Sequence, residues 1–373
     1  MDKLYVMYGD QAEEMAVKIM SALDVQQDIA QLGRQNPLIG IKPNLVVSQP
    51  AHWGATTSPE LVRGVIKYLH EYGYKNIIIL ESAWVGDNTE DAFRVCGYKD
   101  ISEDFGVELI DLKKDKAQEL DVEGMKINVC GKALGVDYLI NMPVLKAHCQ
   151  TKMTCALKNL KGCIPDKEKR RFHTMGLHRP IAALNKVIKT NLVVVDGIVG
   201  DLTYEGGGNP VQMNRVIAGT DPVMVDTYAA ELIGYQVDDI PYIGMAEELG
   251  VGSAQLVRED IDELNCLGDA PAVGEILASQ EADRLAYWVL EQKACSACYS
   301  SLIHALQRLK DKGNLEQLTE KVYVGQGFKG KEKSGIGVGT CTGKLTKNVT
   351  GCPPTAKNIV SFLEAYLMAG NQS

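Results

Sequence analysis

The sequence has no excess of positively charged residues and no long hydrophobic run. Lysine and arginine total 39 against 48 aspartates and glutamates, which gives a net charge of −9 over 373 residues. A protein whose main task is to bind the phosphate backbone of nucleic acids needs a basic surface, so we expect no nucleic-acid partner. No apolar stretch reaches the roughly 20 residues of a transmembrane helix, so we expect no membrane partner.

A secretory signal and a nucleotide-binding loop are also missing. The first residues, MDKLYVMYGDQAEEMAVKIM, are acidic where a signal peptide is basic, and they lack a continuous apolar core. This favours a cytoplasmic location. The segment CTGKL is similar to the end of a P-loop, but Val338 stands where the first glycine belongs and Leu345 replaces the Ser or Thr. We therefore expect no Walker-type ATPase.

What the chain does have is an alternation of short apolar runs and amphipathic segments. LYVMY, LIGIK and NIIILES are typical of strands, and QAEEMAVKIMSAL and PELVRGVIKYLHEYG have the period of helices. In the second of these helices Ser58 is the expected N-cap, Pro59 the first residue and Gly73 the stop signal. Further strands are predicted at VELIDL, VDYLINMPVL, NLVVVDGIV and RVIAG. The pattern predicts an α/β fold with a mostly parallel sheet flanked by helices.

The length of the chain is sufficient for two domains. Residues 267–282, LGDAPAVGEILASQEA, have the composition of a connector, and the strand-like segment YWVL follows them. We therefore predict an α/β domain over residues 1–282 and a second, smaller α/β domain over residues 283–373.

Four of the ten cysteines follow this connector, as Cys295-x-x-Cys298, Cys341 and Cys352-Pro353. In a reducing compartment, metal binding or redox chemistry is commoner for such cysteines than a disulfide framework. A CxxC at a strand-to-helix turn points two thiolates at one centre, and a proline directly after the last ligand is common at iron–sulfur sites. The spacing predicts that these four cysteines bind a [4Fe-4S] cluster in the second domain.

Two local features support a cluster at these cysteines. Three glycines precede Cys341 and allow a close approach of the backbone. Cys298 and Cys352 are expected just ahead of helices, whose N-termini favour the negative charge of a thiolate-ligated cluster. Two alternatives remain open, namely a structural zinc ion on the same thiolates and four buried free cysteines.

Polar residues collect where the predicted strands of the first domain end. Ligands of doubly wound sheets bind beyond the carboxyl ends of the strands. Lysines grouped there form a local cationic site in an acidic protein, which suits a phosphate or carboxylate. The predicted ligand is therefore an anionic small molecule, and its predicted binding residues are Lys42, Asn44, Lys146, Lys158 and Asn159.

Histidines and carboxylates near the same strand ends are candidates for proton transfer. His148 and His173 could exchange protons with a substrate, and Asp196 could orient a base or an ion, so these three are the predicted catalytic residues. Carboxylates could also hold a divalent cation, since hard cations prefer several carboxylate ligands. The alternative for them is a role as loop and cap residues. The carboxylates concerned are Asp196, Asp201, Glu205 and Asp226.

The first part of the chain resembles the family catalogued as domain of unknown function 362. The blocks IGIKPNLV, ATTSPELVRGVIKYL, LKAH, ALKNLKGCIP and DPVMVDTYAAELIG carry the resemblance, which spans about residues 3–265. Members of that family are often coupled to iron–sulfur modules, but the family implies no settled reaction. Cys149 departs from the family pattern, in which we expect a glycine after the histidine.

The C-terminal cysteine pattern resembles the proximal [4Fe-4S] module of hydrogenase small subunits and of the corresponding subunit of respiratory complex I. The matching segments are Cys295-Ser-Ala-Cys298, Gly339-Thr-Cys341 and Val349-Thr-Gly-Cys352-Pro-Pro. This resemblance implies a [4Fe-4S] cluster and not hydrogenase activity. The hypothesis is an iron–sulfur oxidoreductase or electron-transfer protein that acts on an anionic small molecule or a redox protein partner. A non-enzymatic iron–sulfur scaffold or sensor is the alternative.

Overall fold

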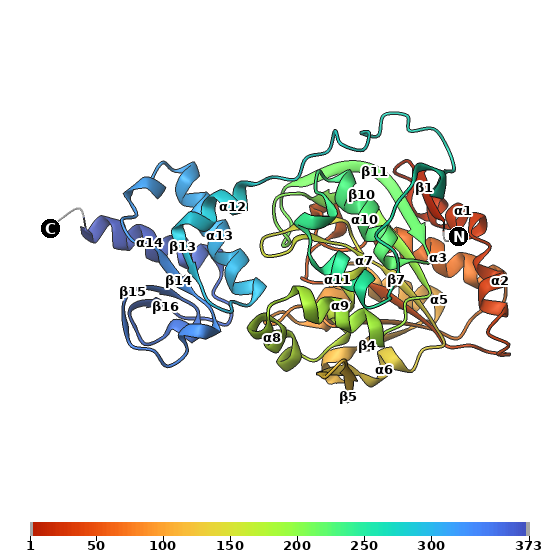
Figure 1. Ribbon diagram of the computed structural model, residues 1–373, viewed down its shortest axis with the longest axis horizontal. Coiled ribbons are helices and arrows are strands. Elements are labelled where there is room, and N and C mark those ends of the chain that lie inside the picture. Colours follow the sequence, from red (N-terminus) through yellow and green to blue (C-terminus); the bar gives the residue numbers. More distant parts are fainter. Residues whose placement is uncertain (1–2, 371–373) are drawn as a thin grey trace. The chain divides into compact units, whose positions relative to one another are not determined.

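The structure, a computed structural model, describes residues 3–370. The chain divides into two compact units (Figure 1). The first unit runs up to Lys169 and continues from Leu177 to Ala278, and the second takes Arg170–Gly176 and the chain from Ser279 onward. The sequence predicts a boundary at residue 283 and gives no sign that a segment near residue 170 joins the second unit.

A sheet of eight strands forms the middle of the first unit. The strands are β1 Leu4–Tyr8, β2 Ile39–Pro43, β3 Ile77–Glu81, β4 Glu108–Asp111, β7 Tyr138–Met142, β10 Leu192–Asp201, β11 Pro210–Gly219 and β12 Ile261–Glu263. Their order is β12-β1-β11-β10-β7-β2-β3-β4. All neighbours pair in parallel except β11, which is antiparallel to β1 and β10. The mostly parallel sheet is confirmed.

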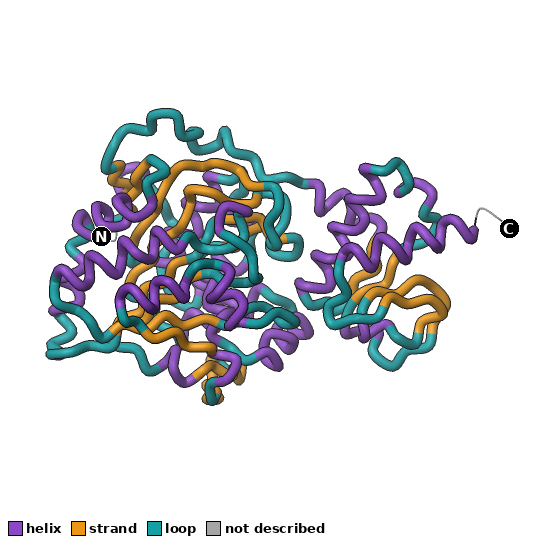
Figure 2. Tube along the Cα trace, turned by 180° about the vertical axis from the view of Figure 1, so that it is seen from behind, coloured by secondary structure: helices purple, strands orange, loops and turns teal. Residues whose placement is uncertain are grey.

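Helices cover both faces of this sheet, and Figure 2 shows the strands between them. On one face α1 (Ala12–Ala22) packs on α3 (Pro59–Glu71), and their apolar side chains share a core with those of β2, β3 and β10. On the other face α7 (Ala156–Asn159) contacts β7, and α10 (Pro222–Leu232) contacts β10 and β11. The remaining helices are α2 Val25–Ala30, α4 Thr89–Val95, α5 Tyr98–Phe105, α6 Gly131–Leu134, α8 Asp166–Met175, α9 His178–Val187 and α11 Tyr242–Glu248.

The helix α3 begins where the sequence predicts. The Ser58 hydroxyl accepts a hydrogen bond from the backbone N–H of Leu61 at 3.3 Å, and Pro59 is the first helical residue. The helix ends at Glu71, and Gly73 follows with φ +84°. Its buried side includes the expected apolar residues Leu61, Val62, Val65, Ile66 and Leu69.

Two short hairpins of the first unit are absent from the sequence prediction. One pairs β5 (Ala117–Val122) with β6 (Met125–Cys130), and the other pairs β8 (Lys146–His148) with β9 (Lys152–Thr154). Three of the six residues of β5, AQELDV, are polar and four of the six are exposed. Only Leu120 and Val122 alternate with polar residues, which is too short a pattern to mark a strand.

The second unit contains a smaller, fully parallel sheet. Its strands lie in the order β13 (Val289–Glu291), β14 (Val322–Val324), β15 (Lys333–Val338) and β16 (Leu345–Val349). Its helices are α12 (Glu281–Leu285), α13 (Ser296–Asp311) and α14 (Ala356–Gly370), and α13 contacts α14. The predicted second α/β module is therefore present.

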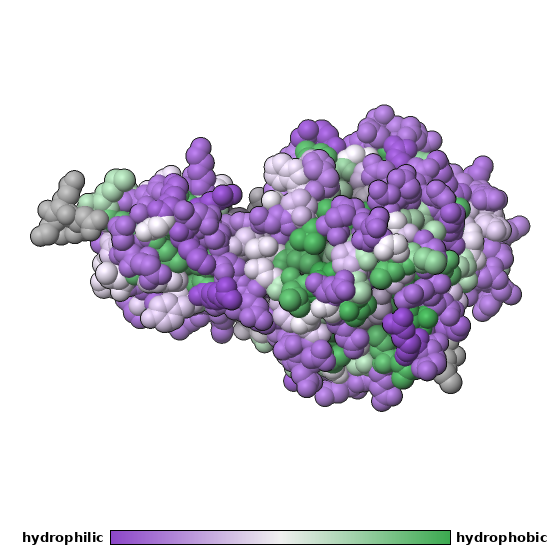
Figure 3. All heavy atoms as spheres, turned by 90° about the horizontal axis from the view of Figure 1, so that it is seen from above, coloured by the Kyte–Doolittle hydropathy of each residue, from purple (hydrophilic) through white to green (hydrophobic). Residues whose placement is uncertain are grey.

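Among the described helices, none combines the length and the apolar character needed to cross a membrane. Figure 3 shows one face of the protein, on which hydrophilic side chains predominate and hydrophobic side chains gather in limited patches.

Candidate functional site

The four C-terminal cysteines lie at one edge of the small parallel sheet. Cys295 follows β13 and is the N-cap of α13, Cys341 follows β15, and Cys352 follows β16. Parallel strands place their carboxyl ends at the same edge of a sheet, so these three loops meet. Cys298 lies in the first turn of α13, and Cys295, Cys352 and Cys341 all act electrostatically on its thiol. Cys298 is thus the common neighbour of the other three.

The helix positions of these cysteines differ in part from the prediction. Cys298 was expected just ahead of a helix but lies inside α13, where its N–H donates to the Cys295 carbonyl oxygen at 3.0 Å. Cys295 takes the position at the helix start instead. Cys352 precedes α14, as expected. Cys295 and Cys298 nevertheless both belong to the N-terminal end of α13, as its N-cap and in its first turn, where the helix dipole favours negative charge.

Burial and mutual repulsion both disfavour thiolates at this edge. Burial, together with the charges of its three cysteine neighbours, raises the pKa of Cys298 to about 12, and the positive charge of Arg170 opposes this rise. Burial also raises the pKa of Cys341, and Cys352 adds to this. Thiolates gathered in this way need a positive centre, and metal ligation supplies one while releasing the thiol protons.

The backbone beside Cys298 fits close packing around a metal centre. Gly339 has φ +94°, and a Cβ at this position would lie 3.5 Å from the Cys298 sulfur. The Gly339 N–H donates to the Val349 carbonyl at 2.8 Å, and the Thr340 N–H donates to the Gly351 carbonyl at 2.9 Å. These bonds tie the loop before Cys341 to the loop before Cys352.

A site for a single metal ion would need its ligands closer together than a [4Fe-4S] cluster does. Within residues 3–370, no group of three or more His, Cys, Asp or Glu side chains is disposed to hold a single metal ion. One tetrahedral zinc ion needs all its sulfur ligands at about 2.3 Å. A [4Fe-4S] cube binds one cysteine at each of its four irons and therefore spaces its cysteine sulfurs more widely than a single ion does.

In the first unit the predicted substrate-binding residues fall into a buried polar network. The Lys42 amine donates to Glu81 at 2.8 Å and to the Pro43 carbonyl at 2.7 Å, and both charged side chains are almost fully buried. The amide of Asn159 accepts from Asn44 at 3.1 Å and donates to the Lys42 carbonyl at 3.1 Å. Gly162 closes over the ion pair, since a Cβ there would lie 2.6 Å from the Lys42 nitrogen. The charge of Lys42 therefore has a partner within the protein.

Within residues 3–370, neither Lys146 nor Lys158 bonds to a carboxylate in this way. Lys146 donates to the carbonyl oxygens of Ala55 and of Glu205, the latter at 3.0 Å. Lys158 is also buried, and among the described residues its amine donates only to the Thr154 hydroxyl, at 2.9 Å. Burial lowers the pKa of Lys146 to about 7, and burial together with the charge of Lys161 lowers that of Lys158 well below its usual value. Of the two buried amines, Lys158 therefore has fewer hydrogen-bond acceptors to offset a positive charge.

His148 faces the carboxylate of Glu205. Its Nδ1 accepts the backbone N–H groups of Gln150 and Thr151 at 3.1 and 3.3 Å, so a neutral ring carries its proton on Nε2. This nitrogen lies 3.6 Å from Glu205 Oε1, and both residues are buried. Glu205 also accepts the Cys149 N–H at 3.2 Å. At 3.6 Å the two groups are not hydrogen-bonded, so a proton would pass between them only after they close to hydrogen-bond distance or through one bridging water.

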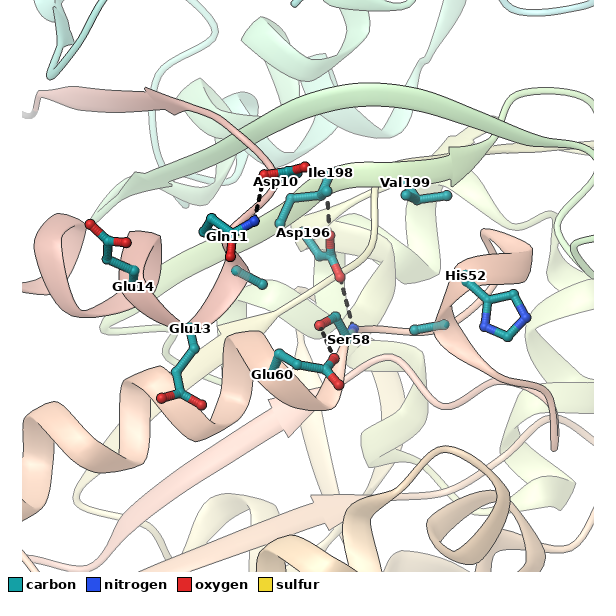
Figure 4. A pocket seen from close by; sticks show the side chains of 12 residues that line it. Asp10, Gln11, Glu13, Glu14, His52, Ser58, Glu60, Asp196, Ile198 and Val199 are labelled. Atoms are coloured by element: carbon teal, nitrogen blue, oxygen red, sulfur yellow. Dashed lines mark hydrogen bonds between the residues drawn. The ribbon is translucent and has the colours of Figure 1, made fainter.

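Asp196 lies apart from these residues, in a cavity of about 490 Å³ (Figure 4). Its carboxylate accepts the N–H groups of Ser58 at 2.8 Å and Ile198 at 3.2 Å, and burial raises its pKa to about 6. The remaining acidic residues of the cavity lie at the N-terminal ends of α1 and α3, where carboxylates offset the helix dipole. They are Asp10, Glu13, Glu14 and Glu60.

Two of the other carboxylates considered for a divalent cation are engaged by the backbone. Asp201 accepts the N–H groups of Thr203, Tyr204 and Asn209 at 2.7 to 2.9 Å. Asp226 accepts the N–H groups at the start of α7, and burial raises its pKa to about 7. These contacts correspond to the loop and cap roles given above as the alternative.

His173 belongs to the segment Arg170–Gly176 and therefore to the second unit, whereas the polar network belongs to the first. Its Nε2 lies 3.5 Å from both the backbone nitrogen and the hydroxyl of Ser296, the residue after Cys295. Gln326, which the sequence did not single out, also contacts this region, and its amide nitrogen lies 3.6 Å from the Cys295 sulfur. In the sequence, Gln326 could be recognised only as a polar residue just after a strand. Its nearness to the cysteines follows from the strand order, which the sequence does not give.

The relatives of this chain cover only part of it. The thylakoid-associated protein sll1697 of Synechocystis sp. is 24% identical over 226 residues, which are 57% of this chain and 67% of that protein. The lactate racemase apoprotein of Thermoanaerobacterium thermosaccharolyticum has 15% identity and a TM-score of 0.37, and a Thermotoga maritima protein of known structure has 15% identity and a TM-score of 0.36. The matched regions are 54% and 60% of those two chains, less than two thirds of each.

A family model covers the centre of the first unit. The family described as Domain of unknown function (DUF362) matches residues 39–231, which are more than half of the chain. The match runs from β2 into α10 and includes the lysine network, His148, Glu205 and Asp196. The cysteines from Cys295 onward lie outside it. The chain therefore belongs to the DUF362 family.

Proposed function

We propose that this protein passes single electrons through a [4Fe-4S] cluster held by Cys295, Cys298, Cys341 and Cys352. The observation that carries the proposal is the meeting of these cysteines at the carboxyl edge of the small sheet, with Cys298 as the common neighbour. Cysteines gathered from several loops, with a proline after the last, fit iron–sulfur ligation better than isolated core thiols do.

The surrounding residues have separate tasks in this proposal. When bound, the cluster supplies one-electron chemistry. The cysteine thiolates hold it, and Gly339 lets the backbone lie against Cys298. Cys352 is exposed, so electrons have a short route to a partner protein at this edge.

We further propose that the first unit binds an anionic small molecule, a carboxylate or a phosphate, at Lys158. The support is the buried amine whose one hydrogen bond within the described residues goes to a hydroxyl group. Lys146 and Lys161 add positive charge nearby, which an anion would offset. His148, paired with Glu205, is the residue proposed to move a proton, and the reaction class is an oxidation or reduction of the bound anion.

Cysteine variants test the cluster. Cys295→Ala and Cys352→Ala should each abolish the broad visible absorption of the anaerobically purified protein, because each removes one ligand. Cys266→Ala is the matched control, since Cys266 is exposed and lies before the second unit. Full absorption in both ligand variants would overturn the proposed ligand set.

A second candidate follows from the exposure of Cys352. An iron–sulfur scaffold or sensor releases its cluster readily, and an exposed ligand favours such release. Rapid loss of the visible absorption in an iron chelator would favour the sensor, and retention of the cluster over hours would favour the electron-transfer protein.

A further inference from the structure

The fourth strand of the small sheet brings an amide to the edge where the other three bring cysteines. The loops after β13, β15 and β16 carry Cys295, Cys341 and Cys352, and the loop after β14 carries Gln326. Because β14 lies between β13 and β15, its loop emerges between those of Cys295 and Cys341. Gln326 thus occupies the position at this edge that has no cysteine.

The amide of Gln326 contacts a cysteine sulfur and the backbone on two sides of it. Its Nε2 lies 3.6 Å from the Cys295 sulfur, 3.0 Å from the Arg170 carbonyl oxygen and 3.3 Å from the Lys293 carbonyl oxygen. All three neighbours are acceptors, which fits the nitrogen and not the oxygen of the amide. The Gln326 backbone N–H also donates to the Lys293 carbonyl at 3.2 Å, so the residue is held at both ends.

Arg170 brings positive charge to the same group of cysteines. It belongs to the segment Arg170–Gly176, which is part of the second unit although the chain before and after it belongs to the first. Its carbonyl oxygen lies 3.0 Å from the same Gln326 amide nitrogen that lies 3.6 Å from the Cys295 sulfur, so a positively charged residue lies next to the cysteine loops. The bond from Gln326 to the Arg170 carbonyl holds the backbone of this residue in place.

We infer that Gln326 and Arg170 set the reduction potential of the cluster; the inference rests on the proposed function. Reduction adds one electron, and with it one negative charge, to the cluster and its four thiolates. A hydrogen bond to a ligand sulfur and a nearby cation both stabilise the added charge, so both raise the reduction potential. The DUF362 portion of the chain thereby contributes a positioning residue, Arg170, to the centre of the second unit.

The test is a dithionite titration of the full-length, cluster-loaded protein, followed by electron paramagnetic resonance. Gln326→Leu removes the donor at similar size and should lower the midpoint potential. Gln326→Glu adds a negative charge as well and should lower it further. Arg170→Gln should also lower it, whereas Arg170→Lys keeps the charge and should restore most of the wild-type value.

Matched controls lie on α13. Gln307→Leu and Arg308→Gln make the same chemical changes away from the four cysteines, and both should leave the potential unchanged. If a Gln326 variant does not take up the cluster, the midpoint potentials of the two Arg170 variants test the inference. Wild-type potentials in the loaded Gln326 and Arg170→Gln variants would overturn the inference and leave the proposed function intact. A wild-type protein that takes up no cluster would overturn both.

Discussion

Buried charges of the first unit are compensated in three different ways. Lys42 has a carboxylate, Lys146 has carbonyl oxygens, and Lys158 has one hydroxyl group. Removing one partner of a buried ion pair costs about 3–5 kcal/mol because the other charge is left uncompensated, so Lys42 and Glu81 depend on each other at the ends of β2 and β3. Lys158 lacks such compensation, which is why the proposed anion is placed there.

Asp196 should make the stability of the protein depend on pH. Its pKa is about 6 in the folded protein against a usual value of 3.8, so the folded state binds the proton more tightly than the unfolded state. The stabilisation of the folded protein that comes from this proton is complete below pH 3.8. It is lost as the pH rises towards 6, and the free energy of unfolding then falls by up to about 1.4 kcal/mol per pH unit. In Asp196→Asn, the free energy of unfolding in urea should therefore fall less between pH 4 and 6.

A neighbouring carboxylate gives the control for this prediction. Asp10→Asn changes an exposed residue of the same cavity and should retain the wild-type pH dependence. An Asp196→Asn protein whose stability follows the wild-type curve over this range would show that burial of Asp196 has no effect on its protonation.

For single residues, the sequence predicts which polar side chains lie near strand ends, but not which groups they bond to. The sequence indicates Lys42 and Lys146 because they follow apolar runs, and Lys158 because it lies at helical spacing in the next segment. Which of them is neutralised depends on contacts between distant segments, such as the 39 residues that separate Lys42 from Glu81. The position of His173 depends in the same way on the segment Arg170–Gly176 joining the second unit.

Secondary-structure elements position the candidate sites, and α3 shows how. Its N-cap Ser58 has a hydroxyl bonded to Leu61 and a backbone N–H bonded to Asp196, so the helix start and the cavity are built together. Ser58→Ala should lower the free energy of unfolding by about 1 kcal/mol, through loss of the cap. Chemical denaturation measures the effect.

Ser21→Ala is the control for the cap. This serine lies inside α1, where its hydroxyl bonds to the Val17 carbonyl, and alanine is a good helix former. The variant should be as stable as the wild type or slightly more stable. A Ser58→Ala protein with unchanged stability would contradict the role of the cap.

Elements with a strong apolar pattern were predictable, and others were not. The strands β2, β3 and β7 are buried along their whole length and are apparent in the sequence as apolar runs. The direction of β11 was not predictable, because an apolar run has the same pattern in a parallel and an antiparallel strand. In the hairpin of β5 and β6, β5 has one buried residue of six, whereas β6 alternates the apolar Met125, Ile127 and Val129 with polar residues, a strand pattern that the sequence prediction missed.

At the scale of the whole molecule, the chain joins a DUF362 unit to a small parallel sheet that gathers four cysteines. The cysteine spacing predicts a common site, and in the fold the loops of Cys295, Cys341 and Cys352 each follow a strand of one parallel sheet. The positions of Gln326 and Arg170 near these cysteines could not be predicted from the sequence. The position of Gln326 depends on the order of the strands, and that of Arg170 depends on the segment Arg170–Gly176 belonging to the second unit.

Iron and acid-labile sulfide analysis of the anaerobically purified full-length protein tests the central claim most directly. A [4Fe-4S] cluster on Cys295, Cys298, Cys341 and Cys352 predicts four irons and four sulfides per chain after reconstitution, with loss of both in Cys352→Ala. Stoichiometric zinc without sulfide, or a protein that binds neither metal, would contradict it.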